Sequence, residues 1–293
     1  MKGYIFIALV LFFQLNFALA MDWKVLHEKA DAATLNAAQE QAGKEPSSKE
    51  ALYVLGLVCL NQHQDAQALD NFNKVLAIDA DSIEGQWGVA EVKRRQHKTG
   101  QSQEMLEAIL KKDPGFSPAL NSLAYIKYRQ MKLEEAVRLA LRVIDKGRPG
   151  SDTSNYVRAL LIYGGTKGMI AHYGGPFSKI VNGTAVLPNI KKAQSIQPDS
   201  AGVYFGLGSF YFLAPAIVGG DMELAKEYLE KAIAKEPLFA DPYVRLAQVY
   251  KQEGDNVKFE EYLNKALKID PGNELALDVK SGSCKFICVG GKE

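Results

Sequence analysis

The chain has few of the side chains on which catalysis and metal binding most often depend. Its 293 residues include only four histidines and three cysteines. The sequence contains no G-x-S-x-G nucleophile motif, no G-x-x-x-x-G-K-[ST] phosphate loop and no C-x-x-C-H haem site. We therefore predict no catalytic residues, no metal site and no cofactor, and a protein that is not an enzyme.

An excess of charge of either sign is also missing. The 35 Lys and Arg residues nearly balance 34 Asp and Glu residues. Proteins that bind nucleic acid normally carry a basic excess, so we expect no nucleic-acid partner. With 47% hydrophobic residues, the chain is too apolar to be disordered and can bury a large core.

The sequence has no apolar stretch long enough to span a bilayer, but its N-terminus has the pattern of a targeting segment. Lys2 precedes an apolar run from Tyr4 to Phe13, and Ala18-Leu19-Ala20 supplies the small residues of a signal-peptidase site. Residues 1–20 are therefore predicted to be a signal peptide of an exported protein, periplasmic or secreted, with no membrane span after cleavage. The run is shorter than the roughly 20 residues of a typical span. Retention as an N-terminal anchor in the inner membrane is the alternative.

Two of the three cysteines lie near the C-terminus. Cys284 and Cys288 are close enough in sequence to form a disulfide in a tight loop, as an oxidising compartment would favour. Two free thiols are the alternative. Cys59 falls on a helix face that we expect to be buried, where it would be a small core residue.

Five prolines recur on a nearly regular period. Pro46 and Pro114 are separated by twice 34 residues, and Pro237 and Pro271 by 34 residues. A period of 34 is typical of a helix–turn–helix array, in which each unit buries its apolar face against its neighbours. Proline cannot continue a helix and so fixes where each hairpin ends. Pro198 is displaced from the period by one insertion, and the step from Pro198 to Pro237 is lengthened by a second.

The apolar residues between these prolines have helical spacing. In the last full unit they follow the tetratricopeptide repeat at several places in phase, namely Tyr243, Leu246, Ala247, Tyr250, Leu263, Ala266 and Pro271. Phe259 departs from that pattern at the twentieth place. The resemblance covers about residues 49–273. It implies an all-α, right-handed superhelical solenoid of antiparallel helix hairpins.

The repeat predicts six full units, at residues 49–82, 83–116, 117–150, 151–200, 201–239 and 240–273. Residues 22–48 are expected to form a degenerate leading hairpin, because Pro46 is already in phase. The solenoid would then span residues 21–273, followed by a tail at 274–293. His63 and His97 occupy the same place in successive turns, where we expect them to be exposed and too far apart to share a metal.

The fourth unit carries about 16 extra residues. Its two helices are expected to run through Tyr156–Tyr163 and Val186–Ala193. The many glycines between them, with Gly174, Gly175 and Pro176, predict an inserted loop. Residues 180–186 could form a short β-hairpin around a turn at Asn182-Gly183.

The fifth unit carries five extra residues. They predict a second loop that includes Pro215, Gly219 and Gly220, with Asp221 as the N-cap of the next helix. Insertions in a solenoid map to loops on one face, often the binding face.

Residues 206–232 carry a narrower resemblance. The segment from Gly206 to Pro215, followed by Gly219-Gly220-Asp221 and Ala225, is similar to part of the TRAP-transporter T-component family. Those proteins are periplasmic helical repeats that associate with a solute-binding subunit. The resemblance implies an alternative function as a transport-associated component that binds a ligand or a subunit.

The tetratricopeptide resemblance also implies which side chains line the concave groove. These places carry aromatic and arginine residues, the usual binding hot spots: Tyr53, Trp87, Arg94, Tyr125, Tyr128, Phe205 and Phe212. The Lys and Asn pair with which chaperone adaptors grip a terminal carboxylate is absent. We predict a scaffold or adaptor of the cell envelope that binds a protein or peptide segment in this groove. A small apolar ligand is an alternative occupant, and packing of these residues against neighbouring hairpins is the alternative to a groove.

Overall fold

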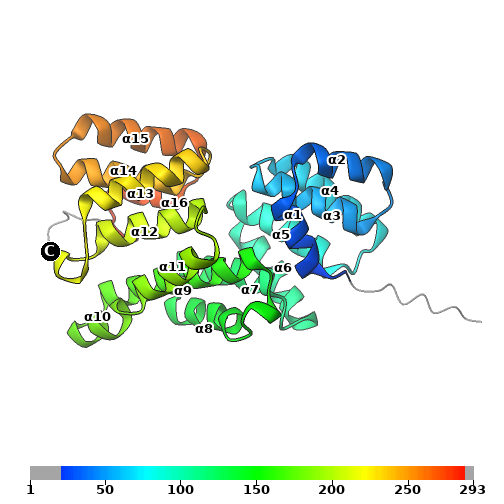
Figure 1. Ribbon diagram of the computed structural model, residues 1–293, viewed down its shortest axis with the longest axis horizontal. Coiled ribbons are helices and arrows are strands. Elements are labelled where there is room, and N and C mark those ends of the chain that lie inside the picture. The colour runs from blue at the N-terminus through cyan, green and yellow to red at the C-terminus, as the bar shows by residue number, and fades with distance from the viewer. Residues whose placement is uncertain (1–20, 288–293) are drawn as a thin grey trace, which may run out of the picture.

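The computed structural model describes residues 21–287, which form an all-helical solenoid without a strand in that range (Figure 1). The leading hairpin and the first three full units consist of α1 (Trp23–Ala32), α2 (Leu35–Lys44), α3 (Lys49–Asn61), α4 (Asp65–Ile78), α5 (Ile83–Arg95), α6 (Thr99–Lys112), α7 (Ser117–Arg129) and α8 (Leu133–Ile144). The later helices are α9 (Thr153–Tyr173), α10 (Pro176–Gly183), α11 (Val186–Ile196), α12 (Ala201–Leu213), α13 (Met222–Lys235), α14 (Ala240–Gln252), α15 (Asn256–Ile269) and α16 (Glu274–Ser281). The predicted fold class is confirmed.

The helices start where the repeat predicts because local capping supports those starts. The hydroxyl of Ser48 accepts from the backbone N–H of Ala51, and the hydroxyl of Ser82 accepts from that of Gly85, each at 3.2 Å. Such side chains satisfy backbone donors that the first helical turn leaves free.

The two helices of a unit approach closely because small residues face large ones. The Phe72 ring is fully buried between Gly56 of its own hairpin and Gly88 of the next. A Cβ atom at either glycine would lie within 2.5 Å of that ring. The first helices of successive units also contact one another and form the inner surface of the solenoid.

The insertion in the fourth unit is helical, so the predicted loop and β-hairpin are wrong. Helix α9 continues through Gly164 to Tyr173, and residues 176–183 form α10. Gly164 allows α9 to approach α11, since a Cβ there would lie 3.3 Å from the carbonyl oxygen of Val186. Asn182 stays helical and bonds the carbonyl of Ser178 through Nδ2 at 3.2 Å. Gly174 ends α9, and Gly175 and Pro176 begin α10.

The insertion in the fifth unit is a loop that contains a 3₁₀ turn at Ala216–Val218. Asp221 caps α13 as predicted, accepting from the N–H groups of Glu223 and Leu224 at 2.9 and 3.0 Å. Gly219 has a φ of 100°, and a Cβ at Gly220 would lie 1.8 Å from the carbonyl oxygen of Ala214. This loop therefore needs glycine at both positions.

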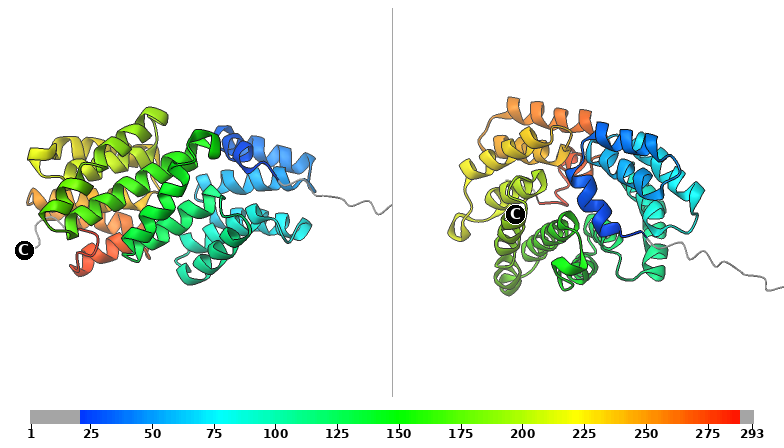
Figure 2. Two further views of the ribbon diagram at one scale, coloured as in Figure 1. Left: turned by 90° about the horizontal axis from the view of Figure 1, so that it is seen from below. Right: turned by 45° about the vertical axis from the view of Figure 1, so that its right-hand side comes forward.

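The solenoid curls so that its two ends face each other. Figure 2 shows the helices arranged around a centre, into which α1 and the C-terminal segment both reach. Among residues 21–287, no helix combines the length and apolar character needed to cross a membrane. The predicted signal peptide and Cys288 lie outside the described residues, so cleavage and the disulfide stay predictions.

Candidate functional site

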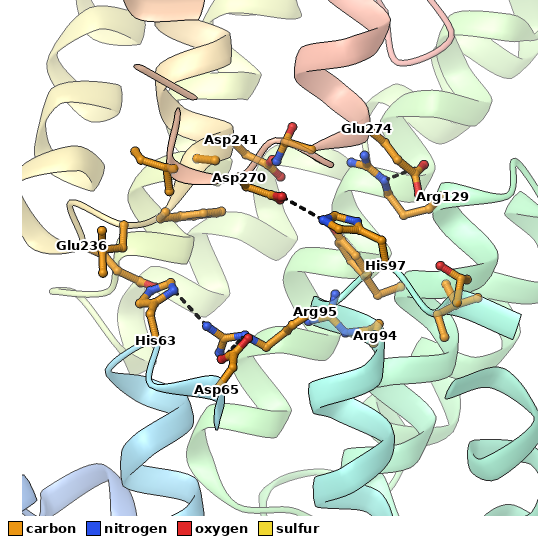
Figure 3. Close-up of a pocket in the computed structure, with 18 residues that line it drawn as sticks. His63, Asp65, Arg94, Arg95, His97, Arg129, Glu236, Asp241, Asp270 and Glu274 are labelled. Carbon is orange, nitrogen blue, oxygen red and sulfur yellow. Dashed lines mark hydrogen bonds and ion pairs between the residues drawn. The ribbon is translucent and has the colours of Figure 1, made fainter. Parts of the chain in front are cut away.

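A cavity of about 470 Å³ lies on the concave side, between the early units and the last two (Figure 3). Helices α5 and α7 and the turns before α4 and α6 form one wall. The corners before α14 and α16 form the other. The histidines, arginines and carboxylates that line it are His63, Asp65, Arg94, Arg95, His97, Arg129, Glu236, Asp241, Asp270 and Glu274.

Two histidine–carboxylate contacts bridge the walls. Nε2 of His63 lies 2.6 Å from Oε1 of Glu236, and Nε2 of His97 lies 2.8 Å from Oδ1 of Asp270. Both pairs are 173 residues apart in the sequence, so two consecutive turns meet two consecutive corners. The repeat itself therefore holds the cavity at a defined width.

Arg95 fixes the tautomer of His63. Its Nη2 lies 2.9 Å from Nδ1 of His63, and its Nη1 donates to the carbonyl of Leu60 at 2.7 Å. A guanidinium has donors only, so Nδ1 must accept. The ring proton then lies on Nε2, which donates to Glu236.

Tyr125 lies between two arginines at the floor of the cavity. The guanidinium carbon of Arg94 is 4.8 Å from the ring centroid, and that of Arg129 is 5.9 Å from it. Burial raises the pKa of the Tyr125 hydroxyl, which stays neutral. Burial also disfavours the charge of Arg129, but the nearby carboxylates of Asp241 and Glu274 help to outweigh it and raise its pKa.

A buried carboxylate holds Arg94 in place. Glu91 accepts from Nη2 and Nε of Arg94 at 2.8 and 3.0 Å, from Ser122 at 2.7 Å and from Arg158 at 3.2 Å. Burial alone would raise the pKa of Glu91. The charges of Arg94 and Arg158, with these hydrogen bonds, outweigh burial and hold the pKa well below its usual range.

Arg94 and Tyr125, both predicted to line the groove, line this cavity, whereas Tyr53 and Trp87 do not. Tyr53 is fully buried and Trp87 is 4% exposed. Helix α1 covers both: Nε2 of His27 lies 2.9 Å from the Tyr53 hydroxyl, and the His27 ring lies 5.3 Å from that of Trp87. The prediction of an open aromatic groove there is wrong, because α1 fills the concave surface of the first units.

The other three predicted aromatics also pack against protein. Phe212 is buried with Leu229 and Leu246, so its assignment to the groove is wrong. Phe205 is half-buried and packs edge-on against Phe239, a cavity-lining residue, with ring centroids 5.2 Å apart. Tyr128 is half-buried against Phe286 of the C-terminal segment.

The cross-cavity role of His63 and His97 was missed in the sequence, which predicted only exposed turn residues. His97 is exposed, as expected, but His63 is half-buried. Both have positive φ, 57° and 59°, at the place where the last unit has Gly254. One sequence signal for this role was available: both histidines stand at a turn position that favours glycine.

The residues predicted in the two insertions, Gly174, Gly175, Pro176, Pro215, Gly219, Gly220 and Asp221, do not line this cavity. Between residues 21 and 287, no three His, Cys, Asp or Glu side chains gather closely enough to hold a metal ion.

Comparison with known proteins agrees with this architecture. Residues 90–152 match the model of a tetratricopeptide repeat family, and residues 192–279 match that of the TRAP transporter T-component. No curated protein matches the chain.

Two crystal structures have a similar fold. A tetratricopeptide repeat protein from Parabacteroides merdae has 17% identity and a TM-score of 0.53, over 88% of this chain and 97% of that chain. The APC/C hetero-tetramer Cut9-Hcn1 has 14% identity and a TM-score of 0.54, over 87% of this chain and 47% of that chain. The fold is that of a tetratricopeptide-repeat solenoid.

Proposed function

We propose that this tetratricopeptide-repeat chain is a non-catalytic scaffold that binds a segment of a partner protein in the cavity on its concave side. The position of Tyr125 between Arg94 and Arg129 carries the proposal. Aromatic and arginine side chains offer large contact areas with orienting polar tips. Because these side chains are already held in place before the partner binds, less conformational entropy is lost on binding.

The chemistry of the lining favours a polypeptide over a small apolar ligand. The lining combines the guanidinium groups of three arginines with carboxylates, among them those of Glu236, Asp270 and Glu274. Such a surface matches backbone amides and charged side chains, whereas sites for small molecules are mostly apolar.

The cell envelope is the proposed location. This part of the proposal rests on the signal-like residues 1–20. Detection of the mature N-terminus near Met21 in an envelope fraction would support it, and recovery of the intact N-terminus in the cytoplasm would contradict it.

Affinity capture from envelope extracts tests partner binding. We expect the full chain to retain a protein that Tyr125→Ala loses. Tyr163→Ala is the matched control, because Tyr163 is a half-buried tyrosine on α9 that does not line the cavity. A partner retained equally by all three proteins would contradict the role of the cavity. Recovery of a solute-binding subunit alone would favour the transport-associated alternative.

A further inference from the structure

The C-terminal segment, residues 283–287, turns back after α16 and lies inside the solenoid (Figure 2). Side chains from four helices surround it, and together they are called the tail site: Tyr128, Arg129, Tyr173, Arg245, Gln248 and Asp278.

The tail site holds the segment mainly through its backbone. Oδ1 and Oδ2 of Asp278 accept from the N–H groups of Lys285 and Phe286, both at 2.8 Å. Arg245 donates to the carbonyls of Phe286 and Ile287 at 2.9 and 3.0 Å. The Tyr173 hydroxyl donates to the carbonyl of Lys285 at 2.9 Å. Side chains that satisfy main-chain groups in this way can hold any short segment of the same shape.

One side chain of the segment is bound specifically. Phe286 is 2% exposed, and the guanidinium carbon of Arg129 lies 4.3 Å from its ring centroid. The Tyr128 ring lies 6.2 Å away. Arg129 also lines the cavity described above, so the two sites share a wall.

The backbone of the segment is strained at two residues, so its shape is not that of a relaxed chain. Cys284 and Ile287 have φ values of 54° and 63°. A left-handed conformation costs a non-glycine residue on the order of 1–2 kcal/mol, and persists only where the surroundings enforce it.

Arg245 points to what could bind here better than the segment does. It is 4% exposed, and its hydrogen-bond partners are the Gln248 side chain and neutral backbone carbonyls. Among the described residues, no carboxylate forms an ion pair with it, and its Nε has no hydrogen-bond partner. Asp241 and Asp278 act on its charge only from beyond contact distance. A buried cation that no carboxylate contacts gains more from a carboxylate than from a carbonyl.

We propose that the tail site binds the C-terminal end of a partner protein, with an aromatic side chain against Arg129 and the terminal carboxylate at Arg245. Residues 283–287 occupy the site until the partner displaces them. The inference rests on the proposed scaffold function and names the chemistry of one partner segment. The carboxylate gives the partner an advantage over an intramolecular competitor, whose effective concentration is on the order of millimolar.

Synthetic peptides test this without a known partner. The probe is the sequence of residues 281–287 with Cys284 replaced by Ser and a free carboxylate after the isoleucine. It is titrated by calorimetry into the full chain carrying Phe286→Ala, which vacates the ring position but keeps the site. We expect binding to Phe286→Ala at least tenfold tighter than to the unchanged chain. A C-terminally amidated probe should bind at least tenfold more weakly, and a probe with Ala for its Phe should not bind.

A second variant and a hydrogen-exchange measurement complete the test. Phe286→Leu keeps most of the side-chain volume and serves if Phe286→Ala does not fold by circular dichroism. In the unchanged chain, an excess of the free-acid probe should speed hydrogen exchange at the Lys285 and Phe286 amides. No binding to either variant, or equal binding of the acid and amide probes, would overturn the proposal. Partner capture that still depends on Tyr125 would leave the scaffold function standing in that case.

Discussion

His63 donates from Nε2 to the carboxylate of Glu236 over 2.6 Å, although 173 residues separate the two in the chain. His97 and Asp270 repeat this contact one unit later, at 2.8 Å and the same separation. The contact between the early and late units therefore follows from the repeat. In each case the turn within an early hairpin meets the acidic corner that precedes a late hairpin. The cavity lies where these two series face each other.

Replacing both histidines with asparagine should open the solenoid. Asparagine tolerates the left-handed turn but is too short to reach the carboxylates. Because the pairs are partly exposed, each contributes only about 0–1 kcal/mol to stability, so the protein should stay folded. The expected result of His63→Asn with His97→Asn is a larger radius of gyration in small-angle X-ray scattering.

Gly254→Asn is the matched control for that experiment. Gly254 occupies the same turn position with a φ of 84°, and a Cβ there meets open space. Its radius of gyration should equal that of the unchanged chain. If the double histidine variant also keeps the original value, the two contacts do not set the closure.

Trp87→Ala should destabilise the fold, because Trp87 packs inside the protein and does not line the open groove that the sequence predicted. Trp87 is 4% exposed, packs against His27 and donates from Nε1 to the Ser122 hydroxyl at 3.2 Å. Removing a buried tryptophan costs about 3–5 kcal/mol. Urea unfolding should show that loss, with a clearly smaller one for half-buried Tyr125→Ala. If Trp87→Ala and Tyr125→Ala lost equal free energies of unfolding, α1 would not cover Trp87.

The sequence was sufficient for the boundaries of the regular repeat helices because their signals are local, but not for the end of α9 or for α10, where it predicted a loop. Ser48, Ser82 and the prolines mark starts and ends within a few residues, and these boundaries agree with the structure. The position of α1 depends on contacts with residues far along the chain, such as Asn155, whose Nδ2 lies 3.2 Å from Nδ1 of His27. No local pattern encodes that contact, so the groove prediction failed at Tyr53 and Trp87.

Glycine was ambiguous for a related reason. Gly164 and Gly168 could break a helix or let two helices approach, and only the presence of α11 beside α9 decides between these outcomes. The cavity depends on curvature that accumulates over several units. The contact between His63 and Glu236 could therefore not be predicted from the pattern of one repeat.

Gly220→Ala should destabilise the loop before α13. The added Cβ would lie 1.8 Å from the carbonyl oxygen of Ala214, a backbone atom that cannot move without shifting the end of α12. We expect a loss of about 2–4 kcal/mol, in the range of strongly disruptive substitutions. Gly175→Ala is the control, because its φ is −68° and a Cβ there has no neighbour within 4 Å. Thermal melting should separate the two variants, and equal midpoints would contradict the close approach.

The buried imidazole of His27 should make stability fall with acidification. Burial lowers its pKa from 6.5 to about 3, with Glu28 opposing and Arg158 adding to the shift. The unfolded chain therefore binds a proton between these values while the folded chain does not. Stability is fully present above about pH 6.5 and is lost as the pH falls toward 3, by at most about 1.4 kcal/mol per pH unit.

His27→Gln isolates that contribution. Burial also raises the pKa of Asp31 and Asp152, which has the opposite effect on stability, but both carboxyls are present in both proteins. Their contributions cancel when the free energies of unfolding of the two proteins are subtracted. Denaturant titrations from pH 7.5 to 4 should show the unchanged chain losing stability relative to His27→Gln as the pH falls below about 6.5. A constant difference over that range would show that His27 titrates alike in the folded and unfolded chains, and so is not sealed under α1.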